Sequence, residues 1–229
     1  MLISIIIPTL NEQAGIADFL AELQPLRSQC ELILVDGGSV DNTVTLAENQ
    51  VDHIILSEQG RAMQMNAGAK IATAPIVLFL HADTFLPSDA IKQIQQAMTM
   101  NHQWGRFGIR LTGKHIMLPI ISWFMNKRSC WTGIATGDQA IFVQKELFDH
   151  IGGFTNISLM EDIALSKKLK QHGKPYYSHS KVISSARRWL KFGVFKTVAL
   201  MWWLRLRFFL GVCPNTLAQQ YREGRFWKA

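Results

Sequence analysis

The first hundred residues contain four short apolar runs, separated by segments in which apolar and polar residues alternate with a longer period. Continuous apolar runs bounded by turn residues are typical of strands that are buried on both faces of a parallel sheet. We therefore expect four strands here, the first of them buried and the last central to the fold. The runs lie within Leu2–Ile7, Glu31–Val35, Asp52–Leu56 and Ile76–Leu80.

The segments between these runs carry the spacing of amphipathic helices. In the first of them, Ile16, Leu20 and Leu23 recur at helical intervals, so a helix opening at Asn11 and Glu12 is expected. Four successive strand–helix units predict a doubly wound α/β fold whose sheet is mainly parallel, with helices on both faces. The three remaining helices are expected over Thr43–Asn49, residues 60–72 and Ser88–Met100.

Beyond residue 100 the pattern is less regular. Gly105–Leu111 alternates apolar and polar residues, which predicts a half-exposed strand. Ile116–Met125 is a dense apolar stretch that ends before Lys127 and Arg128. Further elements are expected over Ala140–Val143 (strand), Lys145–Ile151 (helix), Ile163–Gln171 (helix) and Ser178–Ser184 (strand).

Composition is consistent with one domain. A chain of 229 residues with 48% hydrophobic content is long enough to bury an ample core. Its three cysteines, Cys30, Cys130 and Cys213, show neither metal-ligand spacing nor a disulfide framework, which favours a reducing compartment. The apolar first residues lack the basic segment and cleavage site of a signal peptide, so we expect a cytoplasmic protein whose first segment is a strand.

Positive charge is concentrated near the C-terminus. From Lys181 onward there are ten basic residues and one acidic residue, whereas residues 1–180 carry 14 basic and 16 acidic residues. The apolar run Thr197–Leu204 has eight residues, too few to cross a bilayer, which takes about 20. Arg205 and Arg207 follow it directly and make spanning costlier still.

Mixed Lys, Arg, Trp and Phe is instead the composition of a helix that lies on an anionic lipid surface. We therefore expect peripheral contact with a membrane, at the inner face of the plasma membrane for a cytoplasmic protein. The alternative is a C-terminal helix that packs on its own domain or on a second subunit of a homo-oligomer. A nucleic-acid partner is not expected, because the basic residues are interleaved with apolar ones rather than set on a polar face.

Polar residues follow the apolar runs at the ends where ligands bind in open α/β sheets. An aspartate at such a strand end can hold a divalent metal, and the metal can hold a diphosphate. Some of these residues have a simpler explanation, since Asn11 can cap a helix and Asp36 can stabilise the turn at Gly37. The residues in question are Pro8, Thr9, Asn11, Glu12, Asp36, His81, Ala82 and Asp83.

Five segments, taken together, resemble the family 2 glycosyltransferases: SIIIPTLNE, VDGGSVDNT, the acidic strand end near residue 83, GGF, and LMEDIALSKKLKQHG. They occur in the family's order over residues 2–190. Further segments, GRAMQMNAGA, FLHADT and GDQAIFV, resemble a small bacterial subgroup. The resemblance implies the GT-A fold, with a nucleotide-binding half (1–100), an acceptor-binding half (101–190) and an added basic amphipathic segment (191–229).

The resemblance also implies an activity, the inverting transfer of a sugar from a nucleotide-diphosphate sugar to an acceptor hydroxyl. It assigns Asp162 as the general base, Glu161 as a supporting acceptor contact, and Asp83 as the ligand of Mg²⁺ or Mn²⁺. Family members often have aspartate where His81 stands, so this chain offers one carboxylate instead of two. The alternative for Glu161 and Asp162 is helix capping, because acidic residues stabilise a first helical turn.

Further donor and acceptor contacts follow from the same resemblance. Arg188 stands in a loose match to the arginine–tryptophan element of processive members, with Ser185 where they have glutamine. Trp131 and Asp138 are expected on the acceptor side, where a tryptophan can stack on a sugar ring or simply be buried. The expected donor-binding residues are Pro8, Thr9, Asn11, Glu12, Asp36, Gly60, Arg61, Asn66, His81, Ala82, Asp83 and Arg188; a surface role for Arg61 and a packing role for Asn66 are the alternatives.

Two other functions stay open. A sugar-phosphate nucleotidyltransferase usually carries a glycine-rich loop with an arginine after the first strand, where this chain reads PTLNEQAG. A sugar-nucleotide-binding or membrane-associated scaffold without activity is the other, and the histidine at position 81 is its only support. No motif identifies the donor base, the sugar or the acceptor, although a lipid-linked acceptor would suit a protein at a membrane surface.

Overall fold

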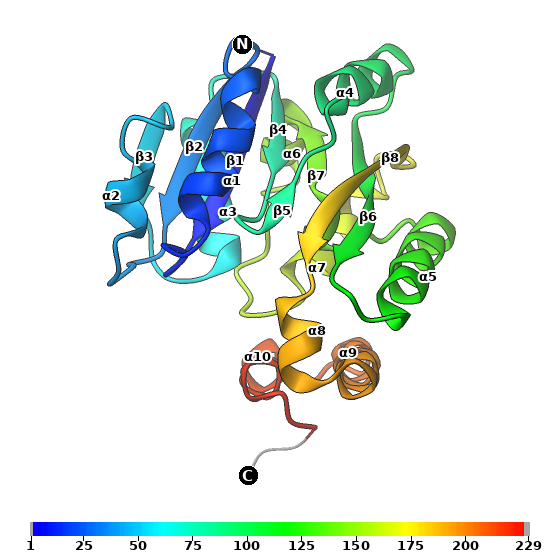
Figure 1. Ribbon diagram of the computed structural model, residues 1–229. Coiled ribbons are helices and arrows are strands. Elements are labelled where there is room, and N and C mark those ends of the chain that lie inside the picture. The colour runs from blue at the N-terminus through cyan, green and yellow to red at the C-terminus, as the bar shows by residue number, and fades with distance from the viewer. Residues whose placement is uncertain (1, 227–229) are drawn as a thin grey trace.

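The computed structural model describes residues 2–226, except the side chain of Arg188. Within this range one eight-stranded sheet runs through the molecule, in the order β3-β2-β1-β4-β7-β6-β8-β5, with helices on both faces (Figure 1). The strands are β1 (Ile3–Thr9), β2 (Cys30–Asp36), β3 (His53–Leu56), β4 (Ile76–Phe79), β5 (Thr84–Phe85), β6 (Trp104–Thr112), β7 (Ile141–Gln144) and β8 (Tyr176–Ser185).

The sheet is parallel in its first half and mixed in its second. Strands β3, β2, β1 and β4 pair in parallel, as the four apolar runs predict. Strand β7 is antiparallel to both β4 and β6, β8 is parallel to β6, and the short β5 is antiparallel to β8. The α/β class is confirmed. The pairing is parallel throughout β3, β2, β1 and β4, and beyond β4 it is mixed.

Two apolar layers hold the helices against the two faces of the sheet. One layer joins β1 and β2 to α1, α4 and α5, and the other joins them to α3, α6 and α7. Because β1, β2 and β4 contribute to both layers, their side chains are apolar on both faces. These helices, with α2, are α1 (Ile16–Leu23), α2 (Thr43–Ala47), α3 (Arg61–Ile71), α4 (Ala90–Thr99), α5 (Met117–Thr132), α6 (Lys145–His150) and α7 (Glu161–Leu169).

Strand β6 corrects the expectation of a half-exposed strand at Gly105–Leu111. It lies between β7 and β8 and is buried over most of its length. Arg110 faces water, but Arg106 is 1% exposed, and its guanidinium stacks on the Tyr177 ring at 4.2 Å. At Gly105 an added Cβ would come within 2.5 Å of the Phe142 ring. The alternation therefore reflects a stacked cation and a close approach, which a pattern of residue types cannot distinguish from solvent exposure.

The first helix also begins later than expected, at Ile16 rather than at Asn11 and Glu12. Asn11 adopts a left-handed backbone conformation with φ of 54°, which a helix start does not allow. Its side-chain Oδ1 accepts a hydrogen bond from the Val40 N–H at 2.9 Å. Asn11 therefore fastens the β1–α1 loop to the β2–α2 loop and does not cap a helix.

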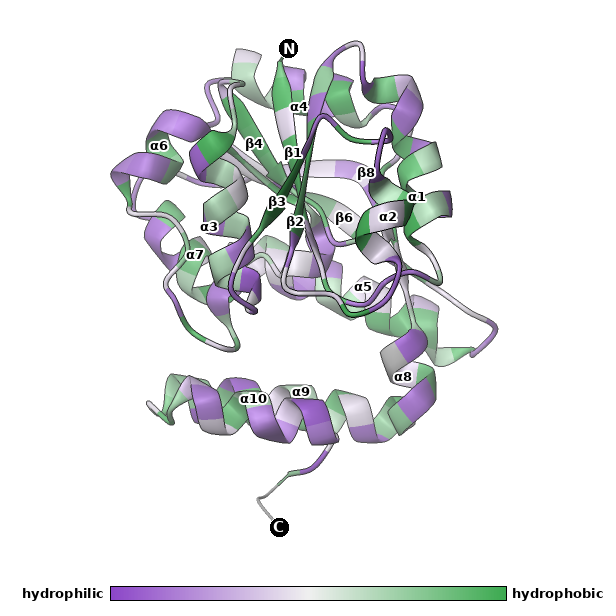
Figure 2. Cartoon of the chain, turned by 90° about the vertical axis from the view of Figure 1, so that its left-hand side faces the viewer, coloured by the Kyte–Doolittle hydropathy of each residue, from purple (hydrophilic) through white to green (hydrophobic). Residues whose placement is uncertain are grey.

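The C-terminal segment forms three helices rather than one: α8 (Arg187–Phe192), α9 (Val194–Phe209) and α10 (Pro214–Glu223). Helices α9 and α10 form a hairpin that crosses the end of the domain (Figures 1 and 2). Leu200, Leu204 and Leu217 of the hairpin pack on Leu159 and Met160, directly before α7. The part of the chain that the structure describes contains no helix with the length and hydropathy needed to cross a membrane.

Candidate active site

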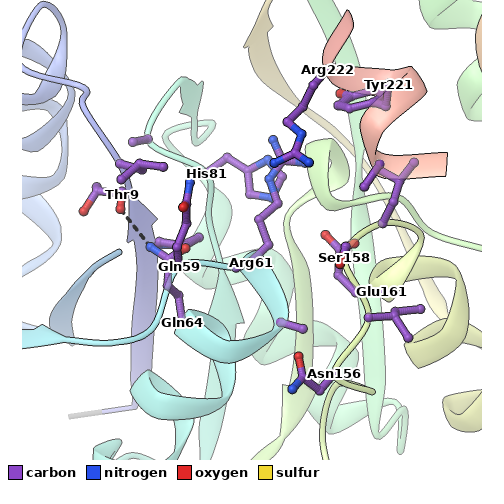
Figure 3. Close-up of a pocket in the computed structure, with 18 of the residues that line it drawn as sticks. Thr9, Gln59, Arg61, Gln64, His81, Asn156, Ser158, Glu161, Tyr221 and Arg222 are labelled. Atoms are coloured by element: carbon purple, nitrogen blue, oxygen red, sulfur yellow. Dashed lines mark hydrogen bonds between the residues drawn. The ribbon is translucent and has the colours of Figure 1, made fainter. Parts of the chain in front are cut away.

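A cavity of about 510 Å³ opens at the carboxyl ends of β1 and β4, with α10 on its far side (Figure 3). Because the carboxyl ends of parallel strands meet at one edge, residues far apart in the sequence gather there. The N-terminus of α3 and the segment before α7 form the rest of the wall. The predicted residues that line it are Pro8, Thr9, Glu12, Gly60, Arg61, His81, Ala82, Asp83 and Glu161.

Helix α3 is fixed against this edge by Gln64. The Gln64 side-chain amide donates hydrogen bonds to the backbone oxygens of Thr9, at 2.8 Å, and Val35, at 2.9 Å. Gly60 precedes the helix with φ of 148°, a conformation that favours glycine. The tight entry places Arg61, the first residue of α3, where its side chain reaches into the cavity (Figure 3).

His81 ends β4 inside the cavity wall and is 7% exposed. Burial lowers its pKa to about 3, and the nearby Arg61 guanidinium lowers the pKa in the same direction. The imidazole is therefore neutral at physiological pH. Its Nδ1 lies 3.7 Å from Oδ1 of Asp138. A residue predicted to bind the sugar donor therefore lies next to one predicted to bind the sugar acceptor.

Asp83 and Glu12 are bridged by an arginine that the sequence analysis did not select. Arg187 Nη2 lies 3.1 Å from Oε2 of Glu12 and 3.4 Å from Oδ2 of Asp83. The motif match had pointed to Arg188, the next residue, whose side chain lies outside the described part of the structure. Arg187 connects α8, and with it the C-terminal segment, to the ends of β1 and β4.

The donor groups present can accommodate a divalent cation that is held largely by substrate. Asp83 offers one carboxylate at the cavity wall. Mg²⁺ in phosphate-transfer sites is commonly held by one or two carboxylates together with substrate phosphates and waters. Over residues 2–226, no three His, Cys, Asp or Glu side chains are grouped so as to hold an ion by themselves.

The Glu161–Asp162 pair begins α7 after a left-handed residue, Met160, with φ of 69°. This sharp turn directs Glu161, which is 6% exposed, into the cavity wall. Asp162 lies beside the wall, where its Oδ2 accepts a hydrogen bond from the Gly137 N–H at 2.9 Å and its Oδ1 accepts one from the Ile163 N–H at 2.7 Å.

Both carboxyl groups have a pKa above the ordinary value. Burial is the main cause in each case, and the neighbouring Asp162 carboxylate raises the pKa of Glu161 further. Arg61 opposes both shifts. The pKa of Asp138 is shifted upward too, by partial burial and by the Asp83 and Asp162 carboxylates. A carboxyl group whose pKa is raised binds a proton more tightly than an exposed one, which favours the uptake of a proton by a general base.

Gly137 connects the histidine to this pair. Its N–H holds Asp162, and a Cβ added to it would lie 2.6 Å from Cε1 of His81. Real Cβ atoms do not approach other heavy atoms so closely. Residue 137 must therefore be glycine for the imidazole and the Asp162 carboxylate to keep their present positions.

Several predicted residues lie away from the cavity. Asp36 is 2% exposed, and its Oδ2 accepts hydrogen bonds from the N–H groups of Gly38 and Ser39, each at 2.8 Å. Asn66 exchanges two hydrogen bonds with the Phe154 backbone, each at 2.9 Å. Trp131 is 81% exposed at the end of α5, so the buried alternative is wrong for it. The substrate contacts assigned to these residues, and to Asn11 and Arg188, stay predictions.

Other residues of the cavity were missed. Asn156 and Ser158 come from the loop before α7, and Asn215, Tyr221 and Arg222 come from α10. The excess of basic residues in the tail was the only sequence signal for Arg222, and it led to the expectation of a membrane surface rather than of a cavity residue. Tyr221 and Asn215 carried no signal.

Sequence comparison identifies the family. A model of glycosyl transferase family 2 matches residues 4–144, more than half of the chain. The chain belongs to glycosyl transferase family 2. The matched range of this family 2 protein runs from β1 to β7, and it includes the strand ends that line the cavity and Gly137.

The chain matches its curated relatives over only part of their length. A "PGL/p-HBAD biosynthesis glycosyltransferase" of Mycobacterium bovis is 41% identical over 93 residues, which cover 36% of this chain and 36% of the relative. An "uncharacterized glycosyltransferase" of Haemophilus influenzae is 30% identical over 109 residues, 44% of each chain. The family 2 protein thus matches less than half the length of these relatives.

Solved structures show the GT-A fold for this family 2 protein. S. aureus TarS, residues 1–349, superposes with a TM-score of 0.64 at 17% identity, covering 87% of this chain and 65% of that one. The mannosyltransferase PcManGT of Pyrobaculum calidifontis, in complex with GDP-Man and Mn²⁺, superposes with a TM-score of 0.63 at 18% identity, covering 89% and 61%.

Proposed function

We propose that this family 2 protein transfers a sugar from a nucleotide-diphosphate sugar to an acceptor hydroxyl, with inversion at the anomeric carbon. The observation that carries the proposal is the Glu161–Asp162 pair, two carboxyl groups of raised pKa, at the edge of a cavity into which Arg61 projects. An acid–base group beside a site for an anionic leaving group is what this transfer needs.

Asp162 is the general base in this proposal. Its carboxylate removes the proton from the acceptor hydroxyl as the hydroxyl oxygen attacks the anomeric carbon. The bond from that carbon to the diphosphate oxygen breaks on the opposite face, and the nucleoside diphosphate leaves with the electron pair. The Gly137 and Ile163 N–H groups fix the carboxylate for this task, and Glu161 contacts the acceptor.

Positive charge near the leaving group comes from this chain's own residues. Arg61 faces the cavity, and its guanidinium lowers the free energy of a diphosphate there. Asp83 would hold Mg²⁺ or Mn²⁺, which when bound supplies Lewis-acid charge neutralisation. Structural neighbours support this choice: a glucosyl-3-phosphoglycerate synthase of Mycobacterium tuberculosis was solved with Mn²⁺ and UDP, TarS with UDP-GlcNAc, and PcManGT with GDP-Man and Mn²⁺.

The test is release of nucleoside diphosphate from a panel of UDP- and GDP-sugars, measured with Mn²⁺ or Mg²⁺ and with EDTA. Slow transfer to water makes this readout independent of the acceptor. We expect release from at least one donor, and a slower rate in EDTA. Binding of a donor with no release under any condition would instead favour a scaffold without activity.

We also propose that α9 contacts an anionic lipid surface. Its outer face exposes Phe195, Trp202, Leu206 and Phe209, at 70%, 71%, 51% and 78%. The segment from Lys181 onward carries ten basic residues and one acidic residue, a net charge of +9 that suits anionic lipid. Exposed aromatic residues next to basic ones are typical of helices that lie in the membrane interface.

Co-sedimentation with vesicles tests this surface. Binding is expected to vesicles that contain phosphatidylglycerol and to be weak with phosphatidylcholine alone. The double variant Trp202→Ser, Phe209→Ser should lose most of it, since each removes a large exposed aromatic side chain from the contact. A double variant that binds as the wild type does would exclude α9 as the contact.

A further inference from the structure

The C-terminal helix α10 forms one wall of the cavity, a role that the family match over residues 4–144 does not cover. Asn215, Ala218, Tyr221 and Arg222 reach it from successive turns of one helix face. A helix added after the matched domain therefore completes the cavity, and its side chains meet whatever binds there.

The α9–α10 hairpin is fastened next to the Glu161–Asp162 pair. Leu217 and Ala218 pack with Leu159 and Met160, immediately before Glu161. The Ser158 hydroxyl donates a hydrogen bond to Oδ1 of Asn215 at 2.5 Å. Because these contacts join α10 to the loop before α7, α10 has a defined position relative to the proposed base.

Two arginines face each other across the cavity. Figure 3 shows Arg222 extending from α10 and Arg61 extending from α3, with their guanidinium groups pointing toward one another. Among the residues that the structure describes, neither side chain makes an ion pair or a hydrogen bond with another side chain. The carboxyl groups of Glu161, Asp138 and Asp162 attract the Arg61 guanidinium from one side of the cavity. A second guanidinium that converges on the same space repels it, and an anion bound between the two arginines would stabilise both.

We propose that Arg222 and Arg61 form a two-arginine clamp for the diphosphate of the donor, an inference that rests on the proposed function. Guanidinium groups bind phosphate oxygens through paired, charge-assisted hydrogen bonds, and two of them on opposite sides match the two phosphates of one diphosphate. The clamp places positive charge from α10 where the leaving group gains negative charge.

In this proposal the C-terminal segment has a second role besides contact with lipid, which is to bind the donor. Arg222 is a basic residue of the tail that lines the cavity, whereas Arg187 bridges Glu12 and Asp83 and Arg207 donates a hydrogen bond to Gln220 within the hairpin. Since the donor lies between α3 and α10 in this arrangement, the diphosphate connects the C-terminal hairpin to the nucleotide-binding half. Diphosphate binding should therefore restrain α10.

Isothermal titration with inorganic diphosphate tests the clamp on the full chain. The variant Arg222→Gln should bind about ten- to a hundredfold more weakly than the wild type, the loss expected for a hydrogen-bonded charge pair. Arg61→Gln should show a loss of similar size. Arg225→Gln is the matched control, since Arg225 is exposed just beyond α10 and does not line the cavity, and its affinity should stay within twofold.

Titrations with further compounds identify the ligand. UDP and GDP should lose affinity in Arg222→Gln, whereas the nucleosides uridine and guanosine should bind both proteins equally. If Arg222→Gln instead weakens glycerol phosphate and leaves inorganic diphosphate unchanged, the site belongs to a phosphate-bearing acceptor and the proposal is overturned. Unchanged affinity for every phosphate compound also overturns it.

Hydrogen exchange supplies a readout that a purely structural role for Arg222 would not move. Saturating diphosphate should slow exchange of the α10 amides in the wild type and have no such effect in Arg222→Gln. Failure of the clamp and failure of the proposed function are separable. If diphosphate binding depends on Arg222 but no donor is turned over, the clamp is supported and the transferase activity is contradicted. If Arg222→Gln turns over donor as fast as the wild type does, the clamp is contradicted and the transferase activity is not.

Discussion

Replacement of Asp162 with asparagine is expected to lower the rate of nucleoside diphosphate release by about 10² to 10⁴-fold, the usual contribution of a positioned general base. Asparagine has the same shape, and its carbonyl oxygen can still accept the hydrogen bond from the Gly137 N–H, while its amide nitrogen takes the place of the acceptor for the Ile163 N–H. The loss should therefore fall on turnover, while the affinity for the donor nucleotide is unchanged. The rate and the affinity are measured on the same preparation.

Glu161→Gln is the comparison variant. Glu161 lines the cavity, but the proposal gives it a supporting contact to the acceptor, so its replacement should lower the rate of release to water much less than the replacement of Asp162 does. If Glu161→Gln abolished turnover and Asp162→Asn did not, the two roles would have to be exchanged. If neither variant changed the rate, the base would have to be sought elsewhere.

The pH dependence of turnover follows from the same assignment. A general base acts when it is deprotonated, so the rate rises with pH as the carboxyl loses its proton. Because burial raises the pKa of Asp162, the rise should occur at higher pH than for an exposed aspartate, whose pKa is about 3.9. The residual rate of Asp162→Asn should no longer rise with pH over this range, whereas the rate of Arg225→Gln should rise as that of the wild type does.

Replacement of Gly137 with alanine is the second change with a large expected effect. The new Cβ would lie 2.6 Å from Cε1 and 2.7 Å from Nε2 of His81, so the imidazole or the backbone must move. Residue 137 also holds the Asp162 carboxylate, and a displacement of about 1 Å at a reacting group can reduce a rate by about 10²-fold. Overpacking should also lower the free energy of unfolding by about 1–3 kcal/mol.

Gly15→Ala is the control for this variant. No atom lies within 4 Å of a Cβ at Gly15, and its φ of −137° is open to any residue. Because Gly15 caps α1, this variant has a small cost in stability of its own, but its rate should match that of the wild type. Wild-type turnover in Gly137→Ala would show that the positions of His81 and Asp162 do not limit the reaction.

The strand ends could be predicted from sequence because their signal is local. An unbroken apolar run identifies a strand buried on both faces, and the polar residue that ends it must lie at the ligand-binding edge. This reasoning places Thr9 and Asp83 at the cavity, and the resemblance to family 2 adds Arg61 and Glu161.

The rest of the cavity could not be predicted because it depends on contacts between distant segments. The position of Arg222 depends on how Leu217 packs against Leu159, and no pattern within α10 specifies that surface. Arg187 illustrates the same limit at close range: the motif match selected its neighbour, and the direction of α8 decides which of the two side chains meets Glu12 and Asp83.

The shift in melting temperature with UDP and with GDP, each with Mn²⁺ and with EDTA, tests the central claim most directly, because every role proposed for the cavity depends on a nucleoside diphosphate binding there. A ligand at 100 times its dissociation constant stabilises a fold by about 2.7 kcal/mol, which for a chain of this size raises the melting temperature by about 5–10 °C. The account predicts such a shift with one of the two nucleotides, larger with Mn²⁺ than with EDTA. No shift with either nucleotide at millimolar concentration would contradict it.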